Sequence, residues 1–358
     1  MIKKLLDTTF FIRLFNWEYW PFHLLYTPVY FYWLWLGIRN RSFFFFSTSN
    51  PTIKNGGFLL ESKKEIYDLI PKKYYPTTLI FKPGSSFNDV INEIKHTGLP
   101  YPIIGKPNIG MQGKAVKKIE TDEDLAAYIS ASKVDFLIQE FVPFQNEVGI
   151  FYYRFPDKST GNISGIVQKE FLAVTGDGSS TMEELLRRDR RFILQLETLR
   201  LSYGDSFNAI LKAGERQVLV PYGNHVRGAK FLDGSHLIDG SLTQVIDEAC
   251  KQIDGFYFGR LDIRYNSWEE LKRGENFSII ELNGAGSEPT HMYDPGHTIL
   301  FAWKEIIRHL NILSRISRMN HKGYKLPYMK MADGLQMFRD NSKYIKILDE
   351  FQLSIPGK

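Results

Sequence analysis

The chain has 358 residues, with 45 Lys and Arg against 40 Asp and Glu, which gives a net charge of +5. This length is enough for about two or three packed units, and the mild positive charge fits anionic substrates or a membrane surface but is too weak to indicate a nucleic-acid partner. The single cysteine, Cys250, excludes an internal disulfide and fits a reducing cytoplasm.

Residues 17–38 form an aromatic, apolar run with basic residues on both sides. The run approaches the roughly 20 apolar residues of a membrane span, but it contains Glu18, His23, Pro21 and Pro28. Trp and Tyr prefer the headgroup zone of a bilayer. We therefore expect a segment that lies in the membrane interface, with packing against the rest of the chain and a true span as the alternatives.

Residues 43–100 read as a short leading unit. Residues 43–46 are a candidate buried strand, and residues 77–81 are another. Residues 63–69 and 86–96 have the caps and the apolar spacing of helices.

A lysine and two glycines mark the next segment. The strand predicted over residues 101–106 ends in Lys106, and the loop that follows contains Gly110 and Gly113 before a strand over residues 115–119. Glycines let backbone N–H groups approach phosphate oxygens, and the lysine supplies a positive charge. The pattern is typical of a loop that covers phosphates, although a glycine hairpin alone is weak evidence.

After a helix predicted over residues 121–131, an apolar strand from residue 136 turns into a linker at residues 141–143. Such a linker offers backbone N–H and C=O groups to the edge of an adenine ring. We assign four consecutive residues to this adenine site: Gln139, Glu140, Phe141 and Val142. A buried strand that carries solvated acids is the alternative.

The middle of the chain predicts antiparallel strands over residues 150–155 and 163–174, followed by a capped helix that begins at residue 182. Arg227 and Lys230 are candidates to bind an anionic substrate, with simple surface placement as the alternative.

Three oxygen ligands lie on two apolar strands, at residues 259–264 and 279–283. Glu281 and Asn283 are two residues apart, so on a strand they point to the same face, and the alternation of the neighbouring strand can aim Asp262 the same way. Oxygen ligands favour Mg²⁺, which usually also holds nucleotide phosphates. Two ordinary strands with acids at their ends are the alternative.

Arg260 lies two residues before Asp262 and therefore shares its face. A cation beside a metal can stabilise charge that develops on a transferring phosphoryl group. The small-residue turn over residues 284–287, which includes Gly286, can present backbone N–H groups to a developing oxyanion. Residues 298–315 and 333–351 read as helices.

These motifs resemble ATP-grasp ligases, in particular D-alanine–D-alanine ligases and the ATP-grasp part of cyanophycin synthetases. In those families a Gly-Arg-x-Asp strand is followed by Glu-x-Asn, a small-residue loop and a His eight residues after the Asn, where this chain has His291. The resemblance covers roughly residues 43–313 and implies an α+β ATP-grasp fold in which two subdomains clamp Mg-ATP. It divides the chain into an aromatic-rich segment (1–42), a short leading unit (43–100), the ATP-grasp domain (101–313) and a helical tail (314–358).

The resemblance also implies roles for single residues. Lys63 has the position of a lysine that reaches the ATP phosphates, although Lys64 beside it leaves the assignment open. Glu147 lies seven residues after Glu140, as does the acid that binds the ribose hydroxyls in the family. Lys169 is a candidate contact to the transferred phosphate or the acid substrate, and His291 would border the acceptor pocket.

One departure concerns the phosphate loop. Met111 and Gln112 stand where D-alanine–D-alanine ligases carry a serine pair that helps to bind the amino acid. This difference puts D-alanine as the substrate in doubt.

By resemblance, the reaction is an ADP-forming carboxylate–amine ligation through an acyl phosphate, with ATP and with Mg²⁺ or Mn²⁺. The carboxylate, whether small-molecule, peptide or lipid-linked, and the amine stay open. We expect a cytoplasmic protein, at the inner face of the membrane if residues 17–38 attach there. The alternatives are a phosphotransferase with a hydroxyl acceptor and a membrane-attached nucleotide-binding module without turnover.

Overall fold

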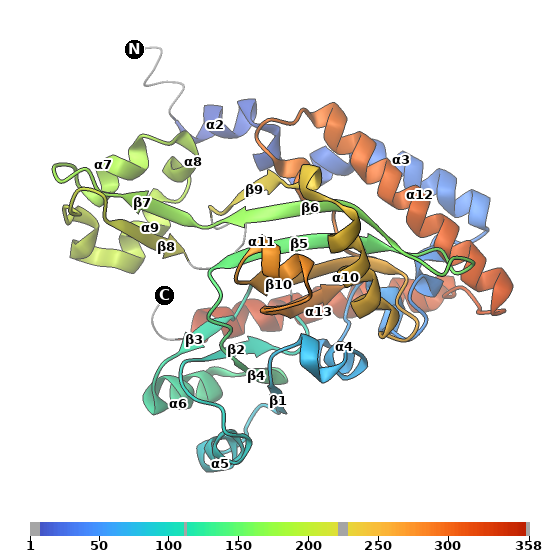
Figure 1. The fold of residues 1–358 in the computed structure, drawn as a ribbon, viewed down its shortest axis with the longest axis horizontal. Helices are drawn as coiled ribbons and strands as arrows, with labels where there is room; N and C mark the ends of the chain where they lie inside the picture. The colour runs from blue at the N-terminus through green and yellow to red at the C-terminus, as the bar shows by residue number, and fades with distance from the viewer. Residues whose placement is uncertain (1–7, 111–112, 221–227, 356–358) are drawn as a thin grey trace.

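The computed structural model describes residues 8–110, 113–220 and 228–355 of the chain. Three β-sheets lie in this described part, with helices packed around them (Figure 1), and each pair of neighbouring strands runs antiparallel. The predicted α+β class is therefore confirmed.

Eleven strands form these sheets in the described residues. The first sheet has the order β1-β4-β2-β3 and consists of β1 (Thr78–Phe81), β2 (Ile103–Pro107), β3 (Lys117–Ile119) and β4 (Phe136–Glu140). The second has the order β11-β10-β5-β6-β9 and consists of β5 (Asn146–Tyr153), β6 (Asn162–Glu170), β9 (Lys230–Asp233), β10 (Phe258–Tyr265) and β11 (Phe277–Asn283). The third pairs β7 (Leu172–Thr175) with β8 (Arg216–Val220).

The helices lie around these sheets. Those before the second sheet are α2 (Thr9–Phe15), α3 (Phe22–Asn40), α4 (Lys63–Leu69), α5 (Phe87–Thr97) and α6 (Asp122–Ala131). The helices that follow β7 in the sequence are α7 (Met182–Arg187), α8 (Arg190–Ile193), α9 (Leu196–Tyr203), α10 (Gly240–Lys251), α11 (Trp268–Lys272), α12 (Ile299–Gly323) and α13 (Met331–Ser354).

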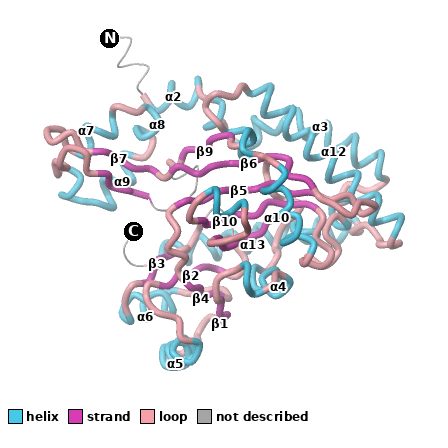
Figure 2. The backbone as a smooth tube through the Cα atoms, viewed as in Figure 1, coloured by secondary structure: helices cyan, strands magenta, loops and turns pink. Residues whose placement is uncertain are grey.

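The first and second sheets have separate hydrophobic cores. Ile150 and Leu261 of the second sheet pack with Ile246 of α10, whereas the core of the first sheet contains residues of α5, α6 and α13. Figure 2 shows β1–β4 as a group of strands apart from β5, β6 and β10. The two sheets meet where Lys106 Nζ on β2 donates a hydrogen bond to the Ile280 carbonyl on β11, at 3.2 Å. The candidate site lies at this junction.

The N-terminal segment packs on α12. Leu25 and Val29 of α3 are buried in one cluster with Ala302 and Ile306 of α12. The inner side of α3 therefore packs against the rest of the chain, which was one of the alternatives for residues 17–38. No helix in the described residues combines the length and apolarity needed to cross a bilayer.

Several predicted elements differ in the structure. The strand predicted over residues 43–46 is wrong, because the chain enters a 3₁₀ turn at Phe45–Thr48 without pairing to a sheet. Phe44, Phe45 and Phe46 are buried with residues of α12 and α13, whereas Phe43 is exposed. A short apolar run has no periodicity that distinguishes a strand from a buried turn. The strand over residues 163–174 is divided into β6 and β7, and α12 continues beyond the predicted end at residue 315 to Gly323.

The C-terminal helix α13 closes the core of the first sheet. Leu348 and Phe351 are fully buried there, and the Phe351 ring lies 5.4 Å from the ring of Tyr128 on α6. The Gln352 side chain accepts a hydrogen bond of 2.7 Å from the Ala115 backbone N–H. The tail is thus part of the lobe that carries Lys106.

We expect Phe351→Ala to lower the free energy of unfolding by about 3–5 kcal/mol, because it leaves a cavity in a close-packed core. Leu353→Ala is the matched control, since Leu353 is 85 % exposed on the same helix, and it should change stability by less than about 0.5 kcal/mol. Chemical denaturation followed by tryptophan fluorescence measures both. Equal stability of the two variants would show that α13 is not part of the folded core.

Candidate active site

Strand pairing brings the predicted metal ligands and Arg260 together. In the β10–β11 pair, Arg260 lies directly opposite Asn283 and Asp262 lies opposite Glu281. Directly opposed residues of antiparallel strands share a face, as do residues two apart on one strand. All four side chains therefore belong to one face of the sheet, and the expectation that Asp262 shares the face of Glu281 is confirmed.

Asp262 is buried between two cations. Arg260 donates to both of its carboxylate oxygens, from Nε at 2.9 Å and from Nη2 at 3.0 Å, and Lys169 Nζ lies 3.3 Å from Oδ1. Directly across on β5 stands Gly149, where a Cβ would lie 2.7 Å from Val167 and 3.0 Å from Asp262 Oδ1. Only glycine leaves room for this arrangement.

Glu147 extends the same network. Its carboxylate is buried, accepts from Lys169 Nζ at 2.8 Å and forms an ion pair with Arg264, whose Nε lies 3.1 Å away. Burial disfavours the charge of Lys169, but Asp262 and Glu147 outweigh it and raise its pKa. Glu147 is thus engaged with two basic side chains, and its ribose-binding role stays a prediction.

Two further lysines approach from the other side of the site. Lys63, at the start of α4, forms an ion pair with Glu281, and its Nζ lies 3.3 Å from the Gly110 carbonyl. Burial disfavours the charge of Glu281, but Lys63, together with Lys106 and Arg260, outweighs that effect and lowers the pKa of Glu281 to about 2. The Lys63 assignment left open above is thus supported by position, since Lys64 instead pairs with Asp68 on the same helix.

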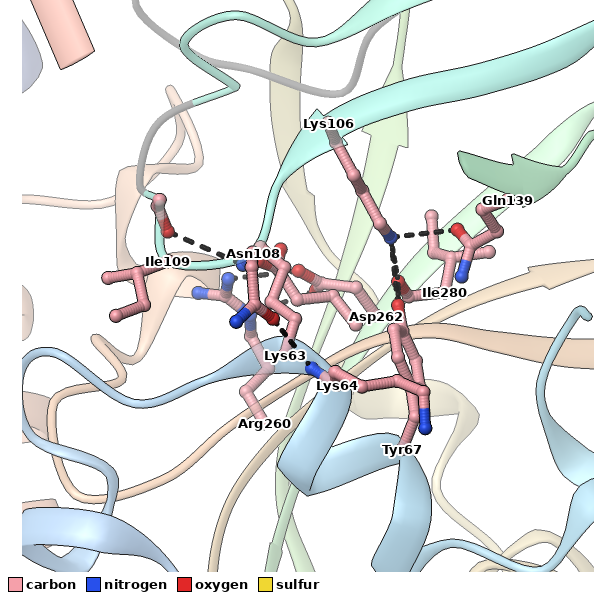
Figure 3. A network of polar contacts seen from close by, with 12 residues as sticks. Lys63, Lys64, Tyr67, Lys106, Asn108, Ile109, Gln139, Arg260, Asp262 and Ile280 are labelled. Carbon is pink, nitrogen blue, oxygen red and sulfur yellow. Dashed lines mark hydrogen bonds and ion pairs between the residues drawn. The ribbon is translucent and has the colours of Figure 1, made fainter. Parts of the chain in front are cut away.

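Lys106 is buried among uncharged acceptors. Within the described residues, its Nζ donates to Tyr67 Oη at 2.8 Å, Gln139 Oε1 at 2.7 Å and the Ile280 carbonyl (Figure 3). Burial disfavours its charge and Lys63 repels it, so its pKa falls to about 7 despite the attraction of Glu281. A bound anion would stabilise the charged form of a lysine held in this way.

The phosphate loop is joined to α4 and α13. The Asn108 side chain accepts from the Lys64 backbone N–H at 3.0 Å, and Tyr344 of α13 donates to the Ile109 carbonyl at 2.8 Å. Gly113 has φ of +66°, a conformation that favours glycine. Gly110 precedes Met111 and Gln112, which lie outside the described residues.

The predicted adenine residues divide into two kinds. Gln139 is buried and uses its side chain to hold Lys106 and to donate to Thr78 Oγ1 at 2.8 Å. Glu140 is exposed and accepts from the Thr77 backbone N–H, while Phe141 and Val142 are half-buried beside it. Gln139 therefore positions a lysine, and the adenine role of all four residues stays a prediction.

The turn over residues 284–287 differs from the prediction. The backbone N–H groups of Ala285 and Gly286 donate to the carbonyls of Gly56 and Gly57, at 3.0 and 2.9 Å. The proposed presentation of the Gly286 N–H to an oxyanion is wrong for this structure, because that donor is already used. The two turns pack so closely that a Cβ on Gly57 would lie 2.7 Å from the Gly284 Cα.

The three other residues predicted to bind substrate are His291, Lys230 and Arg227. His291 is 2 % exposed, its Nε2 lies 3.0 Å from Glu305 Oε2, and its ring would contact any Cβ placed on Gly165 of β6. Such a position is typical of a core histidine, and the acceptor role stays a prediction. Lys230 is half-buried at the start of β9, and Arg227 lies outside the described residues.

Residues that the sequence did not single out also belong to the site. Tyr67 accepts from Lys106 and donates to the Ile280 carbonyl, so it joins α4 to both sheets. Glu288 accepts hydrogen bonds from Tyr26 of α3 and from Tyr293, and its charge acts on Arg260. These contacts join residues up to 262 positions apart in the sequence, so no local sequence pattern predicts them.

The donor set fits a hard cation. Asp262, Glu281 and Asn283 supply oxygens from one face, and the Asn283 Nδ2 is buried without a hydrogen-bond partner among the described residues. Rotation of that amide would exchange its nitrogen for an oxygen. No group of three His, Cys, Asp or Glu suited to a metal occurs in the described ranges, and the role of Asn283 as third ligand stays a prediction.

We expect nucleotide affinity to fall as the pH rises above about 7. Lys106 has a pKa of about 7 in the free protein, and a bound polyphosphate would raise it. Between these two values binding takes up a proton, so affinity falls by up to tenfold per pH unit, whereas below about pH 7 Lys106 adds no pH dependence. Titration calorimetry between pH 6 and 9 measures this slope.

Lys106→Arg is the control for this prediction, because arginine stays charged across that range. The nucleotide's own ionisation is the same for both proteins, so the difference between their slopes belongs to Lys106. Identical slopes would contradict the assigned protonation.

Comparison with known proteins adds one sequence match. No family model matches the chain. Over 137 residues the chain is 29% identical to the glutathione biosynthesis bifunctional protein GshAB of Clostridium perfringens (strain 13 / Type A), which takes in 34% of this chain and 18% of that protein.

Several solved structures show a distant likeness. They include a bifunctional glutathione synthetase from Pasteurella multocida (14% identity, 76% of this chain and 38% of that one, TM-score 0.40) and the VanG D-Ala:D-Ser ligase from Enterococcus faecalis (16%, 74% and 61%, TM-score 0.39). A D-alanine–D-alanine ligase from Bacillus anthracis gives 12% identity, 73% and 68% coverage and a TM-score of 0.41. Scores at this level add nothing to the functional argument.

The chain spans less than a fifth of the length of the curated relative and less than two thirds of the first two solved structures. Of its own motif residues, Arg260, Asp262, Glu281 and Asn283 share one face of the β10–β11 pair. In its sequence motifs, the chain resembles an ATP-grasp ligase.

Proposed function

We propose that this chain is an ATP-dependent, ADP-forming carboxylate–amine ligase that works through an acyl phosphate. The observation that carries the proposal is the single face formed by Arg260, Asp262, Glu281 and Asn283, with Lys63 in contact with it. The name of the curated protein that matches part of the chain supports it, since that protein takes part in glutathione biosynthesis.

In the first step, a substrate carboxylate attacks the γ-phosphorus of ATP, and the bond to the β-phosphate oxygen breaks to leave ADP. We assign Lys63 and Lys106 to the phosphates, where their charges offset the charge that moves to ADP. The linker over residues 140–142 would hold adenine, and Glu147 would hold the ribose. Mg²⁺, when bound by Asp262, Glu281 and Asn283, would neutralise phosphate charge.

In the second step, an amine attacks the acyl carbon, inorganic phosphate leaves, and the amine releases one proton. We assign Arg260 to the oxyanion of the acyl phosphate, and the two hydrogen bonds from its guanidinium to Asp262 support this role. Lys169 is buried behind that pair and orients Asp262. Lys230, Arg227 and His291 are kept as candidates for binding the acid or the amine.

The carboxylate and the amine are small-molecule, peptide or lipid-linked compounds, and no feature of the described surface selects one. We further propose a peripheral contact of residues 17–38 with a membrane, and with it a place at the inner face of that membrane.

We expect Arg260→Ala to keep ATP binding and to lose roughly a hundred- to a thousandfold in turnover, because it removes a donor aimed at developing charge. The assay incubates the protein with Mg-ATP, hydroxylamine and pooled carboxylic acids and detects hydroxamates by mass. Arg273→Ala, which removes an exposed arginine paired with Glu275, is the matched control and should retain turnover.

Two outcomes of this assay would overturn the proposal. Normal turnover of Arg260→Ala would remove Arg260 from the mechanism. ADP release with a phosphorylated hydroxyl compound and no hydroxamate would assign the site to a phosphotransferase.

We expect Glu281→Gln to weaken binding of Mn²⁺ in the presence of an ATP analogue by about tenfold or more, which corresponds to 1.4 kcal/mol or more. The substitution keeps the shape of the side chain but removes one anionic oxygen. Electron paramagnetic resonance of free Mn²⁺ measures the affinity without turnover. Glu275→Gln is an exposed control, and equal affinities of the two variants would exclude Glu281 as a ligand.

A further inference from the structure

We propose that the outward face of α2 and α3 is a docking surface for an anionic lipid bilayer, which would hold the protein with α3 flat in the headgroup zone. The proposal deepens the peripheral contact proposed above and does not depend on the ligase chemistry.

Helix α3 is apolar on both of its sides. Its inner residues pack on α12, as described above. Its outer residues are exposed: Leu24 by 55 %, Phe31 by 70 %, Leu34 by 49 %, Trp35 by 47 % and Ile38 by 71 %. At 3.6 residues per turn, these five positions lie on one side of the helix. A helix that is apolar all round and exposed on one side lacks a partner for that side among the residues that the structure describes.

Helix α2 adds further exposed apolar side chains at the same edge of the molecule. Phe10, Leu14 and Phe15 are 66, 48 and 68 % exposed, and Figure 1 shows α2 and α3 along one edge in the upper part of the view. Single exposed apolar residues are ordinary, but a contiguous set marks an interaction site. Large aromatic side chains in such a set suit the zone between lipid headgroups and acyl chains.

The charge of this face has one sign. Across residues 9–41 the sequence contains a single acid, Glu18, which pairs with Arg191 at 2.7 Å. Arg39 is exposed at the end of α3, and its guanidinium carbon lies 5.2 Å from the centre of the Trp35 ring. A cation is therefore held at the border of the apolar stripe.

Helix α12 continues the basic border. Lys304, Arg315 and Lys322 are exposed, and their spacing of eleven and seven residues puts them on one side of the helix. Asn311 lies on that side as well and accepts a hydrogen bond of 2.6 Å from Tyr32 of α3. The two helices run side by side (Figure 1), so the apolar stripe is bordered by lysine and arginine.

An anionic bilayer matches both features at once. Its interface accepts the aromatic and aliphatic side chains, and its headgroups attract the basic border, which contributes about fivefold in affinity for each lysine or arginine near the surface.

The test is co-sedimentation of the full chain with vesicles of phosphatidylcholine alone or mixed with phosphatidylglycerol. We expect binding to the mixed vesicles that weakens with salt. Phe31→Ser with Ile38→Ser should reduce this binding by about tenfold or more. Arg39→Gln with Lys304→Gln should reduce it by about fivefold per charge on the mixed vesicles, with little change on neutral ones.

The matched control is Leu201→Ser with Leu353→Ser, two leucines that are 81 and 85 % exposed on α9 and α13. This variant should bind like the unchanged protein. Binding of an ATP analogue confirms that each variant is folded, and hydroxamate formation is scored separately, so failure of the ligase assay does not decide the lipid assay.

Three results would overturn the proposal. The first is that the unchanged protein remains in the supernatant with both kinds of vesicle. The serine variant of α3 could bind as well as the control variant. Light scattering could show a dimer that the α3 variant dissociates, in which case the face joins two copies of this chain.

Discussion

Asp262 lies at the centre of a buried chain of ion pairs that runs from Arg260 through Lys169 and Glu147 to Arg264. Three strands of the second sheet supply these residues, so the network holds β5, β6 and β10 in a fixed register. Loss of one partner from such a network leaves another charge buried without compensation, at a cost of about 3–5 kcal/mol. The geometry of the site therefore depends on all of its members.

The opposite side of the site has a different electrostatic character. Lys106 is fully surrounded by protein, and its hydrogen bonds within the described residues go to a phenol, an amide and a carbonyl. The nearby Lys63 is already paired with Glu281. A buried ammonium without an anionic partner is costly unless it loses its proton or gains an anion. An anion such as a polyphosphate, bound at the junction of the two sheets, would remove this cost.

Local patterns were enough to predict part of the site. Glu281 and Asn283 share a face because strand alternation has a period of two, and Gly113 adopts a positive φ in a loop rich in glycine. Gln139 lies at the end of its strand as predicted, but the sequence does not show that its side chain accepts a hydrogen bond from Lys106, and its adenine role stays a prediction. The oxyanion role predicted for the Gly286 N–H and the strand predicted over residues 43–46 were wrong for a similar reason. The groups that these residues contact lie in turns and helices far along the chain.

The sequence by itself determined the α+β class, the helix and strand types over most of the chain and the face shared by the predicted metal ligands. These features follow from periodicity, capping and spacing within a few residues, and such local preferences act before the chain is packed. Only the tertiary structure decided that His291 is buried against Glu305, that Tyr67 links Lys106 to β11 and that Tyr26 reaches Glu288 from α3. Each of these contacts joins segments distant in the sequence, and its geometry depends on how the helices and sheets pack.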